Sequence, residues 1–211
     1  MQPLYFESPY GKTLLTPYEW QKPICDALQQ KLASFRIARQ MGGSLLSLYH
    51  AFHICDPFVS SVKQHVLIVS PNYQTANGKK DMARNICRNT GIPFYESQRV
   101  LEFENGSTIR FENGNNLSEF SLKGSKFHSV FINDDTFISF SIYESVFYPF
   151  VMGESNFVSF GIGPDHPLDK MTARGERYTF PYTCNPNAEQ VVQNLKGVMT
   201  PEMWMREMLA E

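Results

Sequence analysis

The chain has 211 residues, of which 42% are hydrophobic and 19% charged, so it has the composition of an ordinary globular protein. This length suits one good-sized domain or two small ones. The formal net charge of -2 excludes a strong overall basic field, so nucleic acid would have to be contacted through a local patch or with partner subunits. No apolar run reaches the ~18 residues of a membrane span. The four cysteines, which form no CxxC pair, predict free thiols in a reducing, intracellular compartment.

The first part of the chain predicts an arm and a helix. Residues 1–15 are rich in Pro, Gly and Tyr and predict an extended arm, followed by one domain over residues 16–211. Thr16 has the spacing of a capping box and predicts a helix that runs to about Ala33. Pro23 argues against an unbroken helix there, so the alternative is a start just before Pro23.

The next segment reads as strand, glycine turn and helix. Residues 35–38 form a short β-like run, the glycines at 42 and 43 follow, and residues 44–55 are apolar and helix-like. The run HVLIVS at 65–70 is a clear strand, and residues 73–89 predict a polar helix.

A β-hairpin is the clearest local pattern. In RVLEFENGSTIRFENGNN, two alternating strands flank Asn105-Gly106, which tolerates the positive φ of a two-residue turn. Three further strands and a final helix are predicted at residues 128–133, 156–163, 177–182 and 200–210. Strands separated by helices predict an α/β fold with a mainly parallel sheet that is covered on both faces.

The glycine turn has the position of a phosphate-binding loop. Such a P-loop uses backbone N–H groups at a helix N-terminus, a lysine that reaches the outer phosphates, and a Ser/Thr hydroxyl that holds magnesium. Here Gly43 occupies the lysine position, while Ser44 is available for magnesium or as a helix N-cap. By spacing alone, an ordinary glycine turn that caps a helix remains the alternative.

Several motifs, in order, resemble those of phage large-terminase subunits. ARQMGGSLLS resembles their RQxGKT loop, and LTPYEWQKPICDAL resembles the segment whose glutamine lies near the adenine. FENGSTIRFENG followed by LKGSKFHSVFINDDTFI resembles the family's hairpin, RG step and acidic strand end, and PEMWMREMLAE resembles its closing helix. The resemblance covers residues 13–211. It implies a P-loop NTPase fold of the RecA/ASCE type, with a mainly parallel central sheet flanked by helices and a β-hairpin insertion.

The resemblance also implies site residues. The implied nucleotide-binding residues are Gln21, Arg39, Gln40, Gly42, Gly43 and Ser44. In the family the acidic strand ends in an Asp that orients magnesium and a Glu that polarises the attacking water. These positions fall on Asn133 and Asp134, with Ser44 and Asn133 at the magnesium ion; a one-residue slip would instead use Asp134 and Asp135 as the carboxylates.

The departures from the family pattern predict that ATP hydrolysis is impaired or lost. The loop has no lysine, Asn133 is neutral, Asp134 is one methylene shorter than Glu, and the arginine of the RG step is Lys123. Loss of one preorganised charged group typically costs ~100- to 1000-fold in rate. Nucleotide would still bind through backbone amides and the helix dipole. Arg39, or Lys79 or Lys80 from elsewhere, are candidates to compensate.

Three functions follow from this pattern. The first is a terminase-like nucleotide-binding domain for viral DNA packaging in the cytoplasm of an infected host cell, with ATP and Mg²⁺ as cofactors if the site works. Its implied partners are double-stranded DNA, a portal, a small terminase subunit or other terminase subunits. The second is a catalytically inactive binding or assembly factor of the same fold, and the third is a helicase half-motor, which would share the sheet and lack the hairpin. The nuclease domain that follows in the family is not expected within these residues.

Other polar groups predict ordinary structure. His50 and His53 have a metal-binding spacing without a nearby carboxylate or cysteine pattern, which favours packing. The group Asp165, His166 and Asp169 reads as a polar loop. Two lysine patches, one on the polar helix and one at residues 123–126, read as solvated faces.

Overall fold

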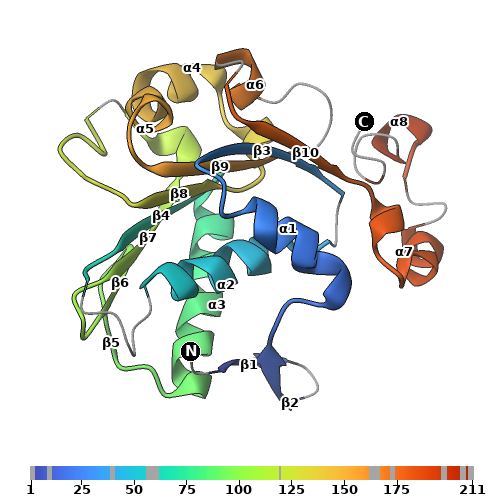
Figure 1. The fold of residues 1–211 in the computed structure, drawn as a ribbon, viewed down its shortest axis with the longest axis horizontal. Helices are drawn as coiled ribbons and strands as arrows, with labels where there is room; N and C mark the ends of the chain where they lie inside the picture. Colours follow the sequence, from blue (N-terminus) through green and yellow to red (C-terminus); the bar gives the residue numbers. More distant parts are fainter. Residues whose placement is uncertain are drawn as a thin grey trace.

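The computed structural model describes residues 3–8, 11–38, 41–55, 62–118, 120–161, 167–171, 174–195, 199–204 and 208. Their central feature is an eight-stranded sheet in the order β10-β3-β9-β8-β4-β7-β6-β5 (Figure 1). The strands from β10 to β7 are parallel, and β6 and β5 continue the sheet antiparallel. The strands are β3 (Leu32–Ile37), β4 (His65–Ser70), β5 (Phe94–Glu96), β6 (Val100–Phe103), β7 (Thr108–Asn113), β8 (Ser129–Ile132), β9 (Asn156–Gly161) and β10 (Glu176–Phe180). This is the predicted mainly parallel sheet with a hairpin added at one edge.

Helices cover both faces of the sheet (Figure 1). On one face lie α1 (Lys22–Ala27), α2 (Gly43–Cys55) and α3 (Tyr73–Thr90); on the other lie α4 (Phe140–Ile142), a π-helical turn (Tyr143–Phe147), α5 (Tyr148–Met152) and α6 (Pro167–Met171). The helices α7 (Ala188–Leu195) and α8 (Pro201–Trp204) follow the edge strand β10, and single 3-10 turns lie at Glu19–Gln21, Gly114–Asn116, Asp135–Phe137 and Tyr182–Cys184.

The two faces bury separate apolar cores. In β4, Val66 and Ile68 pack under α2 and α3, whereas Leu67 and Val69 pack under the π-helical turn and α5. This alternation is the period of two that a strand imposes, and a strand buried on both faces reads as a continuous apolar run. The run HVLIVS was recognisable from sequence for this reason.

The N-terminal residues form a small sheet of their own. Strands β1 (Leu4–Ser8) and β2 (Gly11–Leu15) pair antiparallel in the segment expected as an extended arm. The hairpin is fixed to the far end of α3 because the amides of Tyr5 and Glu7 donate to Thr90 Oγ1 at 2.8 Å and Asn85 Oδ1 at 2.7 Å.

Two local predictions were wrong. A helix running to Ala33 is contradicted, because α1 begins beside Pro23 and ends at Ala27, and Ala33 is buried within β3. The two-residue turn is contradicted as well, since only Gly106 of the Asn105-Gly106 pair has a positive φ, of 78°. Phe103 N–H donates to the Ser107 carbonyl and Gly106 N–H to the Phe103 carbonyl, which makes a three-residue loop with glycine in the left-handed position.

The remaining sequence expectations are simpler to place. All four cysteines are free. The closing helix begins at Pro201, and its residues after Trp204 lie, apart from Met208, outside the described part of the chain. None of the helices in the described part is both long enough and apolar enough to cross a membrane.

Candidate functional site

A cleft of about 670 Å³ lies at the carboxyl ends of the central strands. One wall is the glycine loop at residues 41–44, and the other holds Asn133 and Asp134 after β8, with Asn72 and Thr75 from the start of α3 between them. Ligands of open α/β sheets bind at the carboxyl ends of the strands, and this volume lies within the range of small-molecule sites.

The glycine loop presents the first amides of α2 to the cleft. Gly42 has a left-handed φ of 82°, and a Cβ there would lie 2.7 Å from Gln21 Nε2. Its carbonyl accepts from the amides of Leu45 and Leu46, both at 2.9 Å. The amides of Gly43 and Ser44 precede these first intrahelical bonds and therefore have no partner within the helix. Such amides, together with the positive end of the helix dipole, bind anions.

Gln21 stands behind the loop and supports it. The side chain is 7% exposed; its Nε2 donates to the Met41 carbonyl at 3.0 Å, and its Oε1 accepts from the Tyr18 amide at 3.0 Å. Gln21 does not appear among the residues that line the cleft in the described part of the chain. The other two loop residues singled out from sequence, Arg39 and Gln40, lie outside the described residues.

Asn133 lies at the floor of the cleft and is 2% exposed. Its Oδ1 is 3.4 Å from Ser47 Oγ, but that hydroxyl already donates to the Ser44 carbonyl at 2.9 Å, and it has one proton. Its Nδ2 is buried with no partner. Turning the amide over lets Nδ2 donate to Ser47 and leaves Oδ1 as the open atom, which is the better-satisfied assignment. Asn133 then offers a neutral oxygen where an aspartate would offer a charged one.

Asp134 supplies the carboxylate of the cleft. Its backbone has a φ of 54°, in the left-handed region that Asp tolerates better than most residues, and its side chain is 52% exposed. Asp135 begins the following 3-10 turn, and its side chain lies outside the described set. The side chains after β8 that face the cleft are thus those of Asn133 and Asp134, the pair given by the unslipped alignment.

Lys79 lies behind Asp134, on the inner face of α3. It is 5% exposed; its Nζ donates to Ser70 Oγ at 3.1 Å and lies 3.8 Å from Asp134 Oδ2. Burial lowers the pKa of Lys79 to about 8, an effect that the nearby Asp134 opposes. The expectation of a solvated lysine patch was wrong for Lys79. It fits Lys80 and Arg84, which pair with Glu96 at the surface.

The donors at the cleft suit a magnesium ion that arrives with phosphate. The hydroxyl of Ser44, the amide of Asn133 and the carboxylate of Asp134 line it. In the described part of the chain no group of three or more His, Cys, Asp and Glu could hold a metal by itself. Mg²⁺ commonly keeps several waters and is bound by one or two carboxylates together with substrate phosphates.

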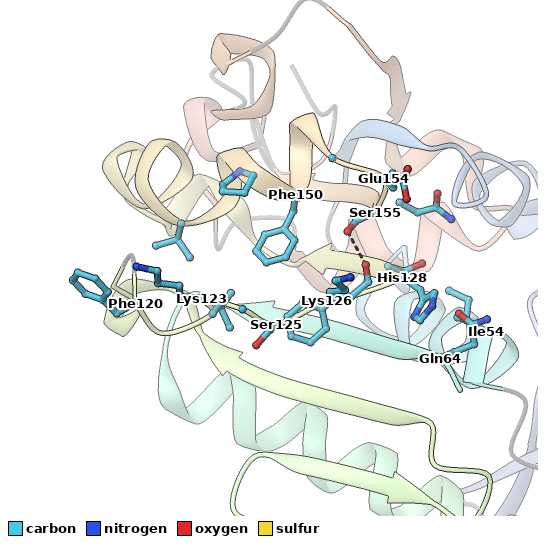
Figure 2. A pocket seen from close by; sticks show the side chains of 18 of the residues that line it. Ile54, Gln64, Phe120, Lys123, Ser125, Lys126, His128, Phe150, Glu154 and Ser155 are labelled. Atoms are coloured by element: carbon cyan, nitrogen blue, oxygen red, sulfur yellow. Dashed lines mark hydrogen bonds between the residues drawn. The ribbon is translucent and has the colours of Figure 1, made fainter. Parts of the chain in front are cut away.

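A second hollow, of about 1070 Å³, lies at the opposite, amino-terminal ends of β8 and β9 (Figure 2). Lys123 and Lys126 line it together with Phe120, His128 and Phe150. Lys123 Nζ sits 5.3 Å from the centre of the Phe120 ring, so this counterpart of the family's arginine is far from its own chain's glycine loop. The second hollow is larger, but the smaller cleft has the strand ends and the helix amides that phosphate chemistry requires.

The two histidines of α2 are packing residues. His50 lies edge-on to Phe131 with ring centres 5.9 Å apart, and burial lowers its pKa to about 4. His53 packs on Tyr49 at 4.1 Å. In the other polar group, Asp165 and His166 lie outside the described residues, as does the side chain of Asp169 in α6.

Neither a protein-family model nor a curated protein matches the sequence. Solved structures do. The large-terminase ATPase domain of Thermus phage P74-26 aligns with a TM-score of 0.71 at 13% identity, over 93% of this chain and 94% of that one. The chain has the fold of a large-terminase ATPase domain. A full-length large terminase from a thermophilic bacteriophage aligns with a TM-score of 0.71 at 12% identity, and that of bacteriophage HK97 with 0.70 at 11% identity.

The terminase fold is matched over most of this chain and over part of the longer proteins. The chain is covered to 93% by the thermophilic-phage terminase and to 98% by the HK97 terminase, while it spans 54% and 52% of their lengths. The same thermophilic-phage terminase has been solved with ADP and with ATP-γ-S. The UvsW helicase of bacteriophage T4 aligns less well, with a TM-score of 0.57 over 83% of this chain, so the helicase alternative shares less of the fold.

Proposed function

We propose that this chain is a terminase-fold nucleotide-binding domain for viral DNA packaging that binds ATP and in which hydrolysis is impaired or lost. The observation that carries the proposal is the cleft at the strand ends, where the amides of Gly43 and Ser44 face Asn133 and Asp134. The solved complexes of the thermophilic-phage terminase with ADP and ATP-γ-S support the choice of ligand by analogy of fold.

Binding is supported by the backbone. Gly42 is held in its left-handed conformation and Gln21 supports the loop from behind, so the amides at the start of α2 are preorganised for a phosphate group. The ligand is expected to enter with magnesium, because the cleft itself supplies a single carboxylate among its described lining residues.

Impaired hydrolysis is supported by the side chains. Phosphoryl transfer needs positive charge at the outer phosphates, a held magnesium ion and an oriented water. Gly43 brings no charge, Asn133 brings a neutral oxygen, and Asp134 has a shorter reach than the Glu of the family pattern. The partners that accompany this function are double-stranded DNA, a portal, a small terminase subunit or further terminase subunits.

Calorimetric titration with ATP·Mg²⁺ tests the binding half. Gly42→Ala forces a Cβ to within 2.7 Å of Gln21 Nε2, whereas the Cβ of Gly43→Ala meets Ile37 at an ordinary 3.4 Å, so the two form a matched pair. We expect binding by the unmodified chain and by Gly43→Ala, and loss of binding by Gly42→Ala. If the unmodified chain binds no ATP, the assignment of the glycine loop is wrong.

A further inference from the structure

A buried lysine faces the end of the sheet from a helix that is otherwise polar. Lys79 is 5% exposed, while its neighbour Lys80 reaches outward to Glu96 at 2.9 Å. Placing an ammonium group away from water is unfavourable unless other groups hold it. The structure offers two such groups, Ser70 Oγ at 3.1 Å and Asp134 Oδ2 at 3.8 Å.

The two groups stand at the carboxyl ends of adjacent strands. Ser70 is the last residue of β4, and Asp134 follows β8, which pairs with β4 in parallel up to the contact of Val69 with Ile132. Lys79 therefore spans the ends of both strands from α3. Glu112 of the neighbouring β7 pairs in register with Val69, whose side chain lies on the opposite face of the sheet, and Glu112 is engaged by Arg99 and Arg110.

The charge balance of the cleft depends on this contact. Among the described residues that line the cleft, Asp134 is the ionisable one, and it is negative. A lone carboxylate opposes the approach of a polyphosphate. Gly43 leaves the loop without the lysine that would offset it, and Lys79 is the cation that stands directly behind Asp134.

We propose that Lys79 is the positioning residue of Asp134: from α3 it fixes this carboxylate against the strand ends and cancels its charge, and so supplies the positive charge that the glycine loop lacks. The nature of the ligand rests on the proposed function. The pairing of Lys79 with Asp134 is a property of the unliganded chain and is tested without nucleotide.

The first test is a titration of Lys79 in the unliganded protein. Its Cε resonance, assigned with Lys79→Arg, reports the lysine pKa, which burial lowers to about 8 and Asp134 holds up. In Asp134→Asn the pKa of Lys79 is expected to fall further. In Ser145→Ala, at the distant second hollow, it is expected to stay unchanged. An unchanged value in Asp134→Asn overturns the pairing.

The second test is calorimetry with ATP·Mg²⁺ on four proteins: the unmodified chain, Lys79→Met, Lys79→Arg and Lys79→Met/Asp134→Asn. We expect Lys79→Met to lose about tenfold in affinity because Asp134 is left uncompensated, and Lys79→Arg to retain most of it. Removing the uncompensated charge in the double variant should restore most of the loss. A merely structural lysine would give Lys79→Met a lower melting temperature and no rescue by Asp134→Asn, and that result overturns the proposal.

The two proposals fail in different ways. An unmodified chain that binds no ATP overturns the proposed function, and a coupled Lys79 titration in the same chain still supports the pairing with Asp134. ATP binding that is identical in the unmodified chain and in Lys79→Met overturns the role of Lys79 and leaves nucleotide binding in place.

Discussion

The glycine-loop wall of the cleft, residues 41–44, offers backbone amides, whereas the strand-end wall, Asn133 and Asp134, offers side chains. The loop wall follows from the fold, because a strand that turns through a left-handed glycine into a helix always leaves its first amides open. The strand-end wall depends on which side chains happen to be present, and a substitution there leaves the backbone unchanged. Binding and hydrolysis are therefore separable in this architecture, and the loop wall fits binding better than the strand-end wall fits hydrolysis.

The largest stability effect is expected at the loop wall. Gly42→Ala must hold an alanine at a φ of 82° and displace the buried side chain of Gln21. A left-handed alanine costs about 1–2 kcal/mol, and the displacement should bring the total to roughly 3 kcal/mol in the free energy of unfolding. Gly43→Ala should change it by less than about 1 kcal/mol. Urea unfolding of both variants measures the difference, and equal stabilities would show that the loop does not need its left-handed glycine.

At the strand-end wall, the effect depends on pH. The pKa of Lys79 is lowered from 10.5 to about 8 in the folded chain, so between these values the unfolded chain holds a proton that the folded chain has released. Stability must then rise with pH across this window, by up to roughly 3 kcal/mol relative to Lys79→Met, whose residue 79 does not titrate. The difference in unfolding free energy between the two proteins, measured from pH 7 to 10.5, checks it. A constant difference would place Lys79 in water.

A smaller effect is expected behind the loop. Gln21→Leu keeps much of the side-chain volume and leaves the Met41 carbonyl and the Tyr18 amide without their partner. The expected loss is roughly 2 kcal/mol in unfolding free energy, with weaker ATP binding because the loop is less well fixed. Unchanged stability with weaker binding would instead place Gln21 in direct contact with the ligand, the role that the family resemblance gave it.

The same division explains what the sequence predicted. The buried strand at His65–Ser70 and the glycine turn into α2 were readable because each has a local pattern, a continuous apolar run or paired glycines between strand and helix. The end of α1 was missed because Leu32 and Ala33 extend only through their pairing with β9, a contact distant in sequence.

The side-chain part of the site was less accessible to sequence. Asn133 and Asp134 were found because they follow an apolar strand, but nothing local indicates that Ser47 meets Asn133 one helical turn after the loop. Lys79 and Lys80 are adjacent in a polar helix, and which of them faces the sheet depends on how α3 rotates around its axis. Helices on both faces hide such differences until the packing is known.

The measurement that tests the account most directly is steady-state phosphate release from ATP·Mg²⁺ by the unmodified chain and by Gly43→Lys/Asn133→Asp. A Cβ at Gly43 meets Ile37 at 3.4 Å and Phe160 at 3.6 Å, so the loop has room for the start of a lysine side chain. The account predicts background release by the unmodified chain and an increase of at least ~100-fold in the double variant, because a charged group is restored at the loop and a carboxylate at the strand end. Robust release by the unmodified chain, equal to or above that of the double variant, would contradict it.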